Sequence, residues 1–151
     1  MKITKRGEYA LKALLALAFV YEQRTLNLRE IARQEEIPAK FLEQIMILLK
    51  KTRLVKSTQG KHGGYSLTRS PRRITLGEII RAVEGPLAPV ATKAEIEERI
   101  RQNDRAAGLY CVFLEVRNVI SEILDKKTLA DVCEKTLELA QSKSSHQMYY
   151  I

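Results

Sequence analysis

The chain has 151 residues, of which 45% are hydrophobic and 29% are charged, and it contains 2 cysteines. These values are typical of a folded globular protein and exclude a disordered chain or a disulfide-stapled scaffold. The net charge is +8 and unevenly spread: residues 1–70 contain 14 Lys and Arg against 6 Asp and Glu, whereas residues 71–151 contain 12 of each. A basic half beside a neutral half is typical of a polyanion-binding module attached to a second element.

The N-terminal region predicts a long internal helix rather than a targeting or membrane segment. The most apolar stretch, residues 10–20, is interrupted by Lys12 and is too short to span a bilayer. The basic start runs into Glu8 without the cleavage-site pattern of a signal peptide. We therefore expect no membrane partner and a cytoplasmic location. A helix from Thr4 to about Glu22, apolar on most of its circumference, should lie at the centre of the core.

The next segment has the pattern of a helix-turn-helix. Asn27 and Glu30 have the spacing of a capping box, which predicts a short helix from about Leu28 to Gln34. Pro38 suits the first position of a second helix, which should reach about Thr52. The residues expected on its inner face are Phe41, Leu42, Ile45, Leu48 and Leu49. Two helices joined by so short a turn form a helix-turn-helix outline.

A β-hairpin is predicted directly after the second helix. Residues 54–57 and 65–67 resemble short strands, and they flank a glycine-rich, basic loop. A helix-turn-helix followed by a hairpin is the element order of a winged helix. Thr75 and Glu78 again have capping-box spacing, and the helix that they begin should stop before Gly85.

The C-terminal half predicts a connector and a dimerisation helix. Residues 86–93 resemble a linker, and residues 94–105 form a highly charged, weakly anchored helix. From residue 109 apolar side chains recur at intervals of four and three, which is a heptad seam of about two heptads. The residues expected in this seam are Leu109, Phe113, Val116, Ile120 and Ile123. So short a seam predicts a helix that pairs with one partner helix rather than a long coiled coil.

The chain should end in a last helix from Thr128 to about Gln141, followed by a mobile polar tether at residues 142–147. The predicted fold class is therefore mainly α with a small β-hairpin. A winged helix-turn-helix DNA-binding domain occupies residues 1–85. The linker, the long C-terminal dimerisation helix and the tail occupy residues 86–151.

The second helix of the helix-turn-helix and the wing are the predicted DNA contacts. Gln44 can pair with an adenine edge, Glu43 can accept from cytosine, and Lys40 can reach guanine or phosphate. A solvated amphipathic helix would show the same pattern, but the adjoining basic wing favours double-stranded DNA, because its glycines permit close approach to a groove or phosphate. The predicted DNA-binding residues are Lys5, Lys40, Glu43, Gln44, Lys50, Lys51, Gln59, Lys61, His62 and Tyr65.

Several motifs together resemble one family. Residues 7–11 (GEYAL), 42–45 (LEQI), 63–67 (GGYSL) and 74–80 (ITLGEII) resemble the Rrf-two (BadM-type) winged-helix transcription regulators. The resemblance covers nearly the whole chain. It implies that the protein is a sequence-specific DNA-binding regulator that acts as a repressor and binds a partly palindromic operator as a homodimer.

Within the family the chain is most similar to the cysteine-metabolism repressors. Residues 84–90 (EGPLAPV) resemble their linker, and residues 121–131 (SEILDKKTLAD) resemble their dimer helix and its exit. The chain also ends, like theirs, on aromatic residues and isoleucine: Tyr149, Tyr150 and Ile151. The resemblance implies control of cysteine and sulfur metabolism. It also implies a partner, cysteine synthase (O-acetylserine thiol-lyase), which would capture these three terminal residues.

The chain departs from the family pattern in the wing and in its cysteines. Gln59 stands where family wings usually carry an arginine, which enters a minor groove more favourably than a neutral amide. Cluster-binding members have three closely spaced cysteines, of which only Cys111 is matched; Cys133 lies outside the pattern. Glu8 falls where some members offer a carboxylate ligand. Glu8 and Cys111 fall short of the four ligands usual for an iron–sulfur cluster, so we expect no metal and no cofactor.

Other functions remain as alternatives. An iron–sulfur or thiol-based redox-sensing regulator of the same fold would use Cys111. A winged-helix protein-interaction module is a second alternative, although the confinement of the charge to the first half argues against it. An enzyme is not expected, because His62 and His146 lie outside the predicted core elements and no nucleophile–base constellation is present.

Overall fold

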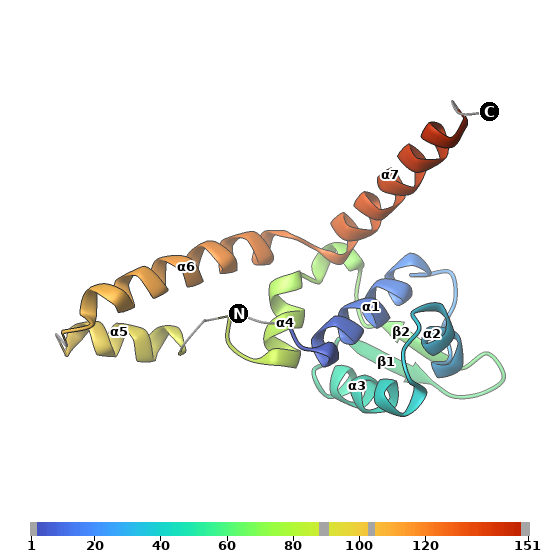
Figure 1. Ribbon diagram of the computed structural model, residues 1–151. Helices are drawn as coiled ribbons and strands as arrows, with labels where there is room; N and C mark the ends of the chain where they lie inside the picture. Colours follow the sequence, from blue (N-terminus) through green and yellow to red (C-terminus); the bar gives the residue numbers. More distant parts are fainter. Residues whose placement is uncertain (1–2, 88–90, 103–104, 149–151) are drawn as a thin grey trace.

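The computed structural model describes residues 3–87, 91–102 and 105–148. It shows a winged-helix domain from which α6 extends with α5 beneath it, while α7 projects in a different direction (Figure 1). In chain order the described elements are α1 (Lys5–Phe19), α2 (Leu28–Gln34), α3 (Ala39–Lys51), β1 (Val55–Thr58), β2 (Gly64–Leu67), the 3₁₀ turn η1 (Pro71–Arg73), α4 (Leu76–Glu84), α5 (Lys93–Arg101), α6 (Ala107–Lys126) and α7 (Leu129–Met148). The predicted fold class, mainly helical with a small hairpin, is confirmed.

The central position predicted for the first helix is also confirmed. Thr4 is the N-cap of α1, and its hydroxyl accepts a hydrogen bond from the backbone of Gly7 at 3.3 Å. Ala10, Ala13 and Leu14 have no exposed surface. The helix ends at Phe19, three residues before the predicted end, because the chain then turns toward α2.

The helix-turn-helix forms as predicted, with one change in the face that α3 buries. Asn27 and Glu30 form the complete capping box, with hydrogen bonds of 2.8 and 3.0 Å between side chain and backbone. The pKa of Glu30 is lowered, first by the backbone hydrogen bond from Asn27 and then by Arg24. The side chains that α3 buries are Leu42, Ile45, Met46 and Leu49.

The inner face predicted for α3 was therefore partly wrong. Phe41 is 38% exposed, and Met46, which was not predicted to be internal, is completely buried. The reason is the phase of the helix: residues 42, 45, 46 and 49 form one stripe at intervals of three and four. Phe41 lies at the edge of that stripe, where its ring packs edge-on against Tyr9 of α1 with centroids 5.7 Å apart.

The wing is a two-stranded antiparallel hairpin. Val55 pairs with Leu67 at its base and Thr58 with Gly64 toward its tip. Leu26 adds a bridge to the outer side of β2, exchanging backbone hydrogen bonds of 2.7 and 3.1 Å with Tyr65. The wing is therefore attached to the loop between α1 and α2 as well as to α3.

The arm consists of α5 and α6 packed against each other (Figure 1). The charged helix expected to be weakly anchored is α5, and the structure corrects this: Ile96 is completely buried, and Arg99 donates a 2.5 Å hydrogen bond to the hydroxyl of Tyr110. The start of α7 returns to the winged domain, since Leu129 is 1% exposed and belongs to the same core.

The polar tether predicted at residues 142–147 was wrong, because α7 continues to Met148. Thr128 and Asp131 cap the start of this helix with mutual hydrogen bonds of 2.8 and 3.2 Å. A capped and packed first turn removes the cost of nucleation, so the helix can continue through polar residues. Within the described residues, none of the helices has the length and apolarity to cross a membrane.

Glycine at position 7 accommodates a carboxylate from α4. The backbone N–H and hydroxyl of Thr4 donate to Oε1 of Glu84 at 2.9 and 2.6 Å. A Cβ atom on Gly7 would lie 2.0 Å from the same oxygen. The Glu84 carboxylate thus sits against the positive N-terminal end of α1, in space that any other residue at position 7 would fill.

The effect of Gly7→Ala on the free energy of unfolding should therefore have opposite signs in the presence and in the absence of the Glu84 carboxylate. In the natural chain the free energy of unfolding should fall by about 1 kcal/mol, because the carboxylate is displaced from its donors. In a Glu84→Ala background the same change should raise it by about 0.5 kcal/mol, the usual helix preference for alanine over glycine. Urea denaturation of the four proteins measures both values. Equal effects in the two backgrounds would contradict the steric coupling.

Candidate nucleic-acid interface

The solvent-facing side of α3 carries a continuous row of side chains. Lys40, Glu43, Gln44, Ile47 and Lys51 are all exposed and follow one another at intervals of three, one, three and four. Ile47 is 60% exposed, so an aliphatic side chain lies within this otherwise polar row. Hydrogen-bonding groups read base edges in a major groove and an aliphatic group contacts a thymine methyl, so this row contains both kinds of reader. Sequence reasoning missed Ile47 because it sought polar residues.

The basic side chains around this row have no acidic partners. The exposed lysines and arginines of residues 29–61 that form no ion pair with another described residue are Arg29, Arg33, Lys40, Lys50, Lys51, Arg53, Lys56 and Lys61. Arg29 and Arg33, one turn apart on α2, and Lys56 on β1 were not predicted. The capping box of α2 could have placed the two arginines on one exposed face.

Lys5 differs from the other predicted cations. Its ammonium lies 2.8 Å from the carboxylate of Glu8, and Lys12 lies 4.0 Å from the other oxygen of that carboxylate. The hydrogen bond between them raises the pKa of Lys5 and lowers that of Glu8. Lys5 is therefore partly engaged within α1, and any DNA contact that it makes competes with Glu8.

The tip of the wing presents Lys61 and His62 to solvent. Gly60 has a φ of 109°, a conformation that favours glycine, and its carbonyl accepts a 2.9 Å hydrogen bond from the backbone of Gly63. The hydroxyl of Thr25 donates to the carbonyl of His62 at 2.9 Å, which ties the tip to the loop before α2. Gln59 is exposed beside this turn.

Tyr65 occupies a different position from the other predicted DNA contacts. Its side chain is half-buried against the core, and its backbone is paired with Leu26. The residue therefore anchors the wing to the winged domain.

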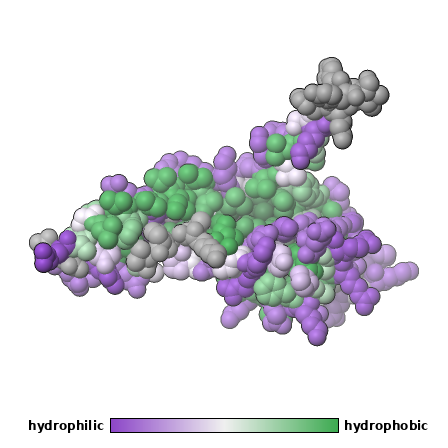
Figure 2. Space-filling view, viewed as in Figure 1, coloured by the Kyte–Doolittle hydropathy of each residue, from purple (hydrophilic) through white to green (hydrophobic). Residues whose placement is uncertain are grey.

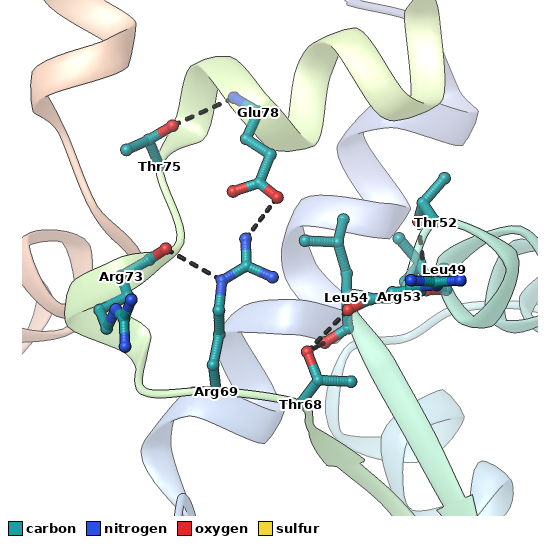
Figure 3. Close-up of polar contacts among 9 residues, drawn as sticks. All are labelled: Leu49, Thr52, Arg53, Leu54, Thr68, Arg69, Arg73, Thr75 and Glu78. Carbon is teal, nitrogen blue, oxygen red and sulfur yellow. Dashed lines mark hydrogen bonds and ion pairs between the residues drawn. The ribbon is translucent and has the colours of Figure 1, made fainter.

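Polar contacts fix the base of the wing to the end of α3 and the start of α4 (Figure 3). The Thr68 hydroxyl donates to the carbonyl of Arg53 at 2.7 Å. The Arg69 guanidinium donates to the carbonyl of Arg73 at 3.1 Å and forms an ion pair with Glu78. These contacts hold the wing and the exposed row of α3 in one arrangement.

The same arginine explains why one predicted capping box is only half formed. The Thr75 hydroxyl accepts from the backbone N–H of Glu78 at 3.2 Å, as expected. The Glu78 carboxylate does not return to the backbone of Thr75; it points to Arg69 instead (Figure 3). A guanidinium is a stronger partner for a carboxylate than a neutral N–H, so the ion pair prevails.

A second surface, on α6, is apolar. Its large exposed side chains are 42% to 57% exposed and recur at intervals of three and four: Leu109, Val112, Val116, Val119 and Ile123. Of the predicted seam, Phe113 and Ile120 are instead half-buried within the chain, and Phe113 packs edge-on against Tyr110. Val112 and Val119 take their places in the exposed row. Figure 2 shows apolar side chains gathered along α6, whereas much of the winged domain is hydrophilic.

The two cysteines lie on helices other than α3. Cys111 is exposed on α6, and Cys133 is half-buried at the start of α7. Burial, and secondarily the charge of Glu134, raises the pKa of the Cys133 thiol, which disfavours its reactive thiolate. The described residues include no group of three or more His, Cys, Asp or Glu placed to hold a metal ion. The predicted partner-binding residues Tyr149, Tyr150 and Ile151 lie outside the described residues.

Comparison with known proteins agrees with this architecture. Residues 3–135 match the family model Rrf2, described as an iron-dependent transcriptional regulator. The HTH-type transcriptional regulator CymR of Bacillus subtilis is 32% identical over 151 residues, covering 100% of both chains. The structure of CymR, the global cysteine regulator of B. subtilis, superposes with a TM-score of 0.76 over 89% of this chain and 98% of that one. The IscR structure of T. potens is 31% identical, with a TM-score of 0.68 over 90% and 88% of the two chains.

The match spans the helix-turn-helix, the wing, the arm of α5 and α6, and the start of α7. These are the elements in which the exposed α3 row, the unpaired cations and the apolar α6 row lie. The chain thus belongs to the Rrf2 family and is a winged-helix, DNA-binding transcription regulator.

Proposed function

We propose that the protein is a repressor that binds a partly palindromic operator as a homodimer, with α3 of each protomer in a major groove and the wing on the adjoining backbone. The observation that carries this proposal is the set of unpaired, exposed cations between residues 29 and 61. Unpaired cations on one module repel one another and gain most from a polyanion, and DNA phosphates release counterions when such groups neutralise them.

The exposed residues at the centre of α3 and the basic residues around them contact different parts of the DNA. Gln44, Glu43 and Ile47 read base edges, because they are exposed at the centre of α3 and combine hydrogen-bonding and aliphatic groups. Lys50, Lys51 and Lys61, with His62 at the wing tip, contact phosphates and position the module without reading sequence. Gln59 makes a neutral contact where the family resemblance implies an arginine, so Lys61 supplies the positive charge at the tip of the wing.

The dimer forms through α6. An exposed apolar row at heptad spacing on a helix that extends away from its own core is stabilised by pairing with the same row of a second chain. Two such chains present two winged domains related by symmetry, which matches a palindromic operator. Phe113 and Ile120 then support the row from beneath.

The regulated process that we propose is cysteine metabolism. The support is the full-length similarity to CymR of B. subtilis, which is named as a global cysteine regulator. Capture of Tyr149, Tyr150 and Ile151 by cysteine synthase stays a prediction, and the mobile tether on which it partly depended is replaced by the helix α7.

The family description raises the alternative of an iron-dependent regulator, and the residues present do not fit an iron–sulfur cluster. Glu8 is ion-paired with Lys5 at 2.8 Å. Of the two cysteines, only Cys111 stands where the family resemblance implies a cluster ligand. Clusters are usually held by four ligands, mostly thiolates, so two candidates per site fall short. Cys111 remains the exposed thiol that a redox-sensing variant of the function would use.

Lys61→Ala and Gln44→Ala should affect DNA binding in different ways. The natural dimer should show a log–log salt slope of roughly −5 if about six phosphates are neutralised. Lys61→Ala should weaken binding to all sequences and flatten this slope by about 2 per dimer. Gln44→Ala should relax the preference at one base position by about 1–3 kcal/mol and leave the slope unchanged.

Fluorescence anisotropy with operator and scrambled DNA distinguishes the two effects. Lys135→Ala is the matched control, because Lys135 is an exposed cation on α7 that pairs with Glu138 at 3.1 Å. The division between wing and helix would be wrong if the Lys61 and Gln44 variants changed the salt slope alike.

Val119→Glu should convert the dimer into a monomer, because two carboxylates would be buried without partners across the apolar row. Asn118→Glu places the same group one residue away, at an exposed position outside the row, and should leave the dimer intact. Sedimentation velocity measures both. A Val119→Glu protein that remains dimeric would place the interface elsewhere.

Protein purified without oxygen should be colourless, with less than stoichiometric iron and sulfide, because the chain offers only two ligands at the family position. Visible absorption spectra and iron analysis check this. A stoichiometric chromophore that disappears in Cys111→Ser would instead make the protein a cluster-based sensor.

A further inference from the structure

The dimer helix is joined to the winged domain by a short paired segment. The backbone N–H of Leu76 donates to the carbonyl of Lys127 at 2.8 Å, and that of Leu129 donates to the carbonyl of Ile74 at 2.9 Å. Thr75 and Thr128 form an antiparallel bridge between them. The end of α6 is thus bonded to the chain where α4 begins, although the two segments are about 50 residues apart in sequence.

A two-pronged ion pair lies next to this bridge. Nη1 and Nη2 of Arg81 donate to Oδ1 and Oδ2 of Asp125, both at 2.7 Å. Two parallel hydrogen bonds fix the orientation of the partners as well as their distance. The pKa of Asp125 is lowered, first by the hydrogen bond from Arg81 and also by the charges of Arg81 and Arg117. The carboxylate is therefore ionised throughout the physiological pH range.

Gly77 provides the space for this ion pair. A Cβ atom at position 77 would lie 2.0 Å from Oδ1 of Asp125. The carboxylate therefore rests on the first turn of α4, where the helix end is positive. The same arrangement recurs at the other end of α4, where Glu84 occupies the space left by Gly7 of α1.

Through these contacts α4 links the dimer helix to the recognition helix. Asp125 joins α6 to α4 through Arg81. Glu84 joins the end of α4 to α1 through Thr4. Tyr9 of α1 contacts Phe41 in the first turn of α3. The helices α1, α3 and α4 each bury one face in the core of the winged domain. A change in the angle between α6 and α4 therefore moves the whole winged domain relative to α6.

We propose that the Arg81–Asp125 ion pair, which we call the clamp, sets the distance between the two recognition helices of the dimer and thereby selects the spacing of the operator half-sites. This inference rests on the proposed dimeric function. Asp125 follows Ile123, the last member of the exposed α6 row, by two residues. The angle at the clamp therefore determines how far each winged domain lies from the dimer axis, and two recognition helices must meet half-sites about one helical turn apart.

Asp125→Ala tests the proposal, with Glu122→Ala as the matched control. Glu122 lies on the same helix and pairs with Lys126 at 2.6 Å, but this pair remains within α6. Each protein is measured against a DNA series in which two identical half-sites are separated by spacers that differ by one base pair. The natural protein and Glu122→Ala should prefer one spacer. In Asp125→Ala the ratio of the affinity for the preferred spacer to that for the other spacers should fall by about threefold to fivefold. This factor corresponds to the free energy of a well-formed surface ion pair. Affinity for a single half-site and the dimer sedimentation coefficient should not change.

A second measurement needs no DNA. Hydrogen exchange at the amides of Leu76 and Leu129 should be faster in Asp125→Ala than in Glu122→Ala, because the clamp protects the adjoining bridge. Unchanged exchange, an unchanged spacer preference, or an equal loss in the control overturns the proposal. If the natural protein binds DNA only as a monomer, the proposed dimeric function fails and the inference about spacing fails with it, and the exchange data show separately whether the clamp exists.

Discussion

The burial of α1 is the constraint on which the remaining structure depends. This helix contacts α2, α3, α4, β2 and α7, so it is surrounded on most of its circumference. Its alanines make this possible: Ala10 and Ala13 are fully buried, and small side chains allow several helices to approach one axis closely. A helix with large side chains at these positions would hold its neighbours apart. Packing against α1 therefore sets the relative positions of α3, the wing and the start of α7.

The two halves of the chain differ in how their basic side chains are paired. In the C-terminal half many basic residues are neutralised locally, as in the pairs Arg72–Glu134 and Lys126–Glu122. In the helix-turn-helix and the wing the exposed lysines and arginines lack such partners among the described residues. Leaving like charges unpaired on a small module costs stability through repulsion. In the proposed function, DNA phosphates offset this cost when they bind.

Two carboxylate–glycine contacts join α4 to its neighbours, one to α1 and one to α6. Gly7 and Gly77 both lie in the first turn of a helix. At each of them the carboxylate of a residue from another helix occupies the space that a side chain would fill. The start of a helix has N–H groups without intrahelical partners and a positive electrostatic potential. A carboxylate placed there is stabilised both by hydrogen bonding and by the helix dipole. The motifs in which these glycines occur were recognisable in the sequence, but their acidic partners, Glu84 and Asp125, lie 77 and 48 residues away.

The sequence by itself determined the element order, the capping of α2, the position of the wing and the family, because these follow from local spacing and turn chemistry. The tertiary structure decided which side of each helix is buried. It placed Met46 rather than Phe41 in the core, and Val112 and Val119 rather than Phe113 and Ile120 in the exposed row of α6, because adjacent apolar stripes differ by one residue and only the neighbouring helix chooses between them. It also directed Glu78 to Arg69 and continued α7 through the polar segment. Each outcome depends on a partner distant in sequence or on the nucleation of a preceding turn, which local patterns do not contain.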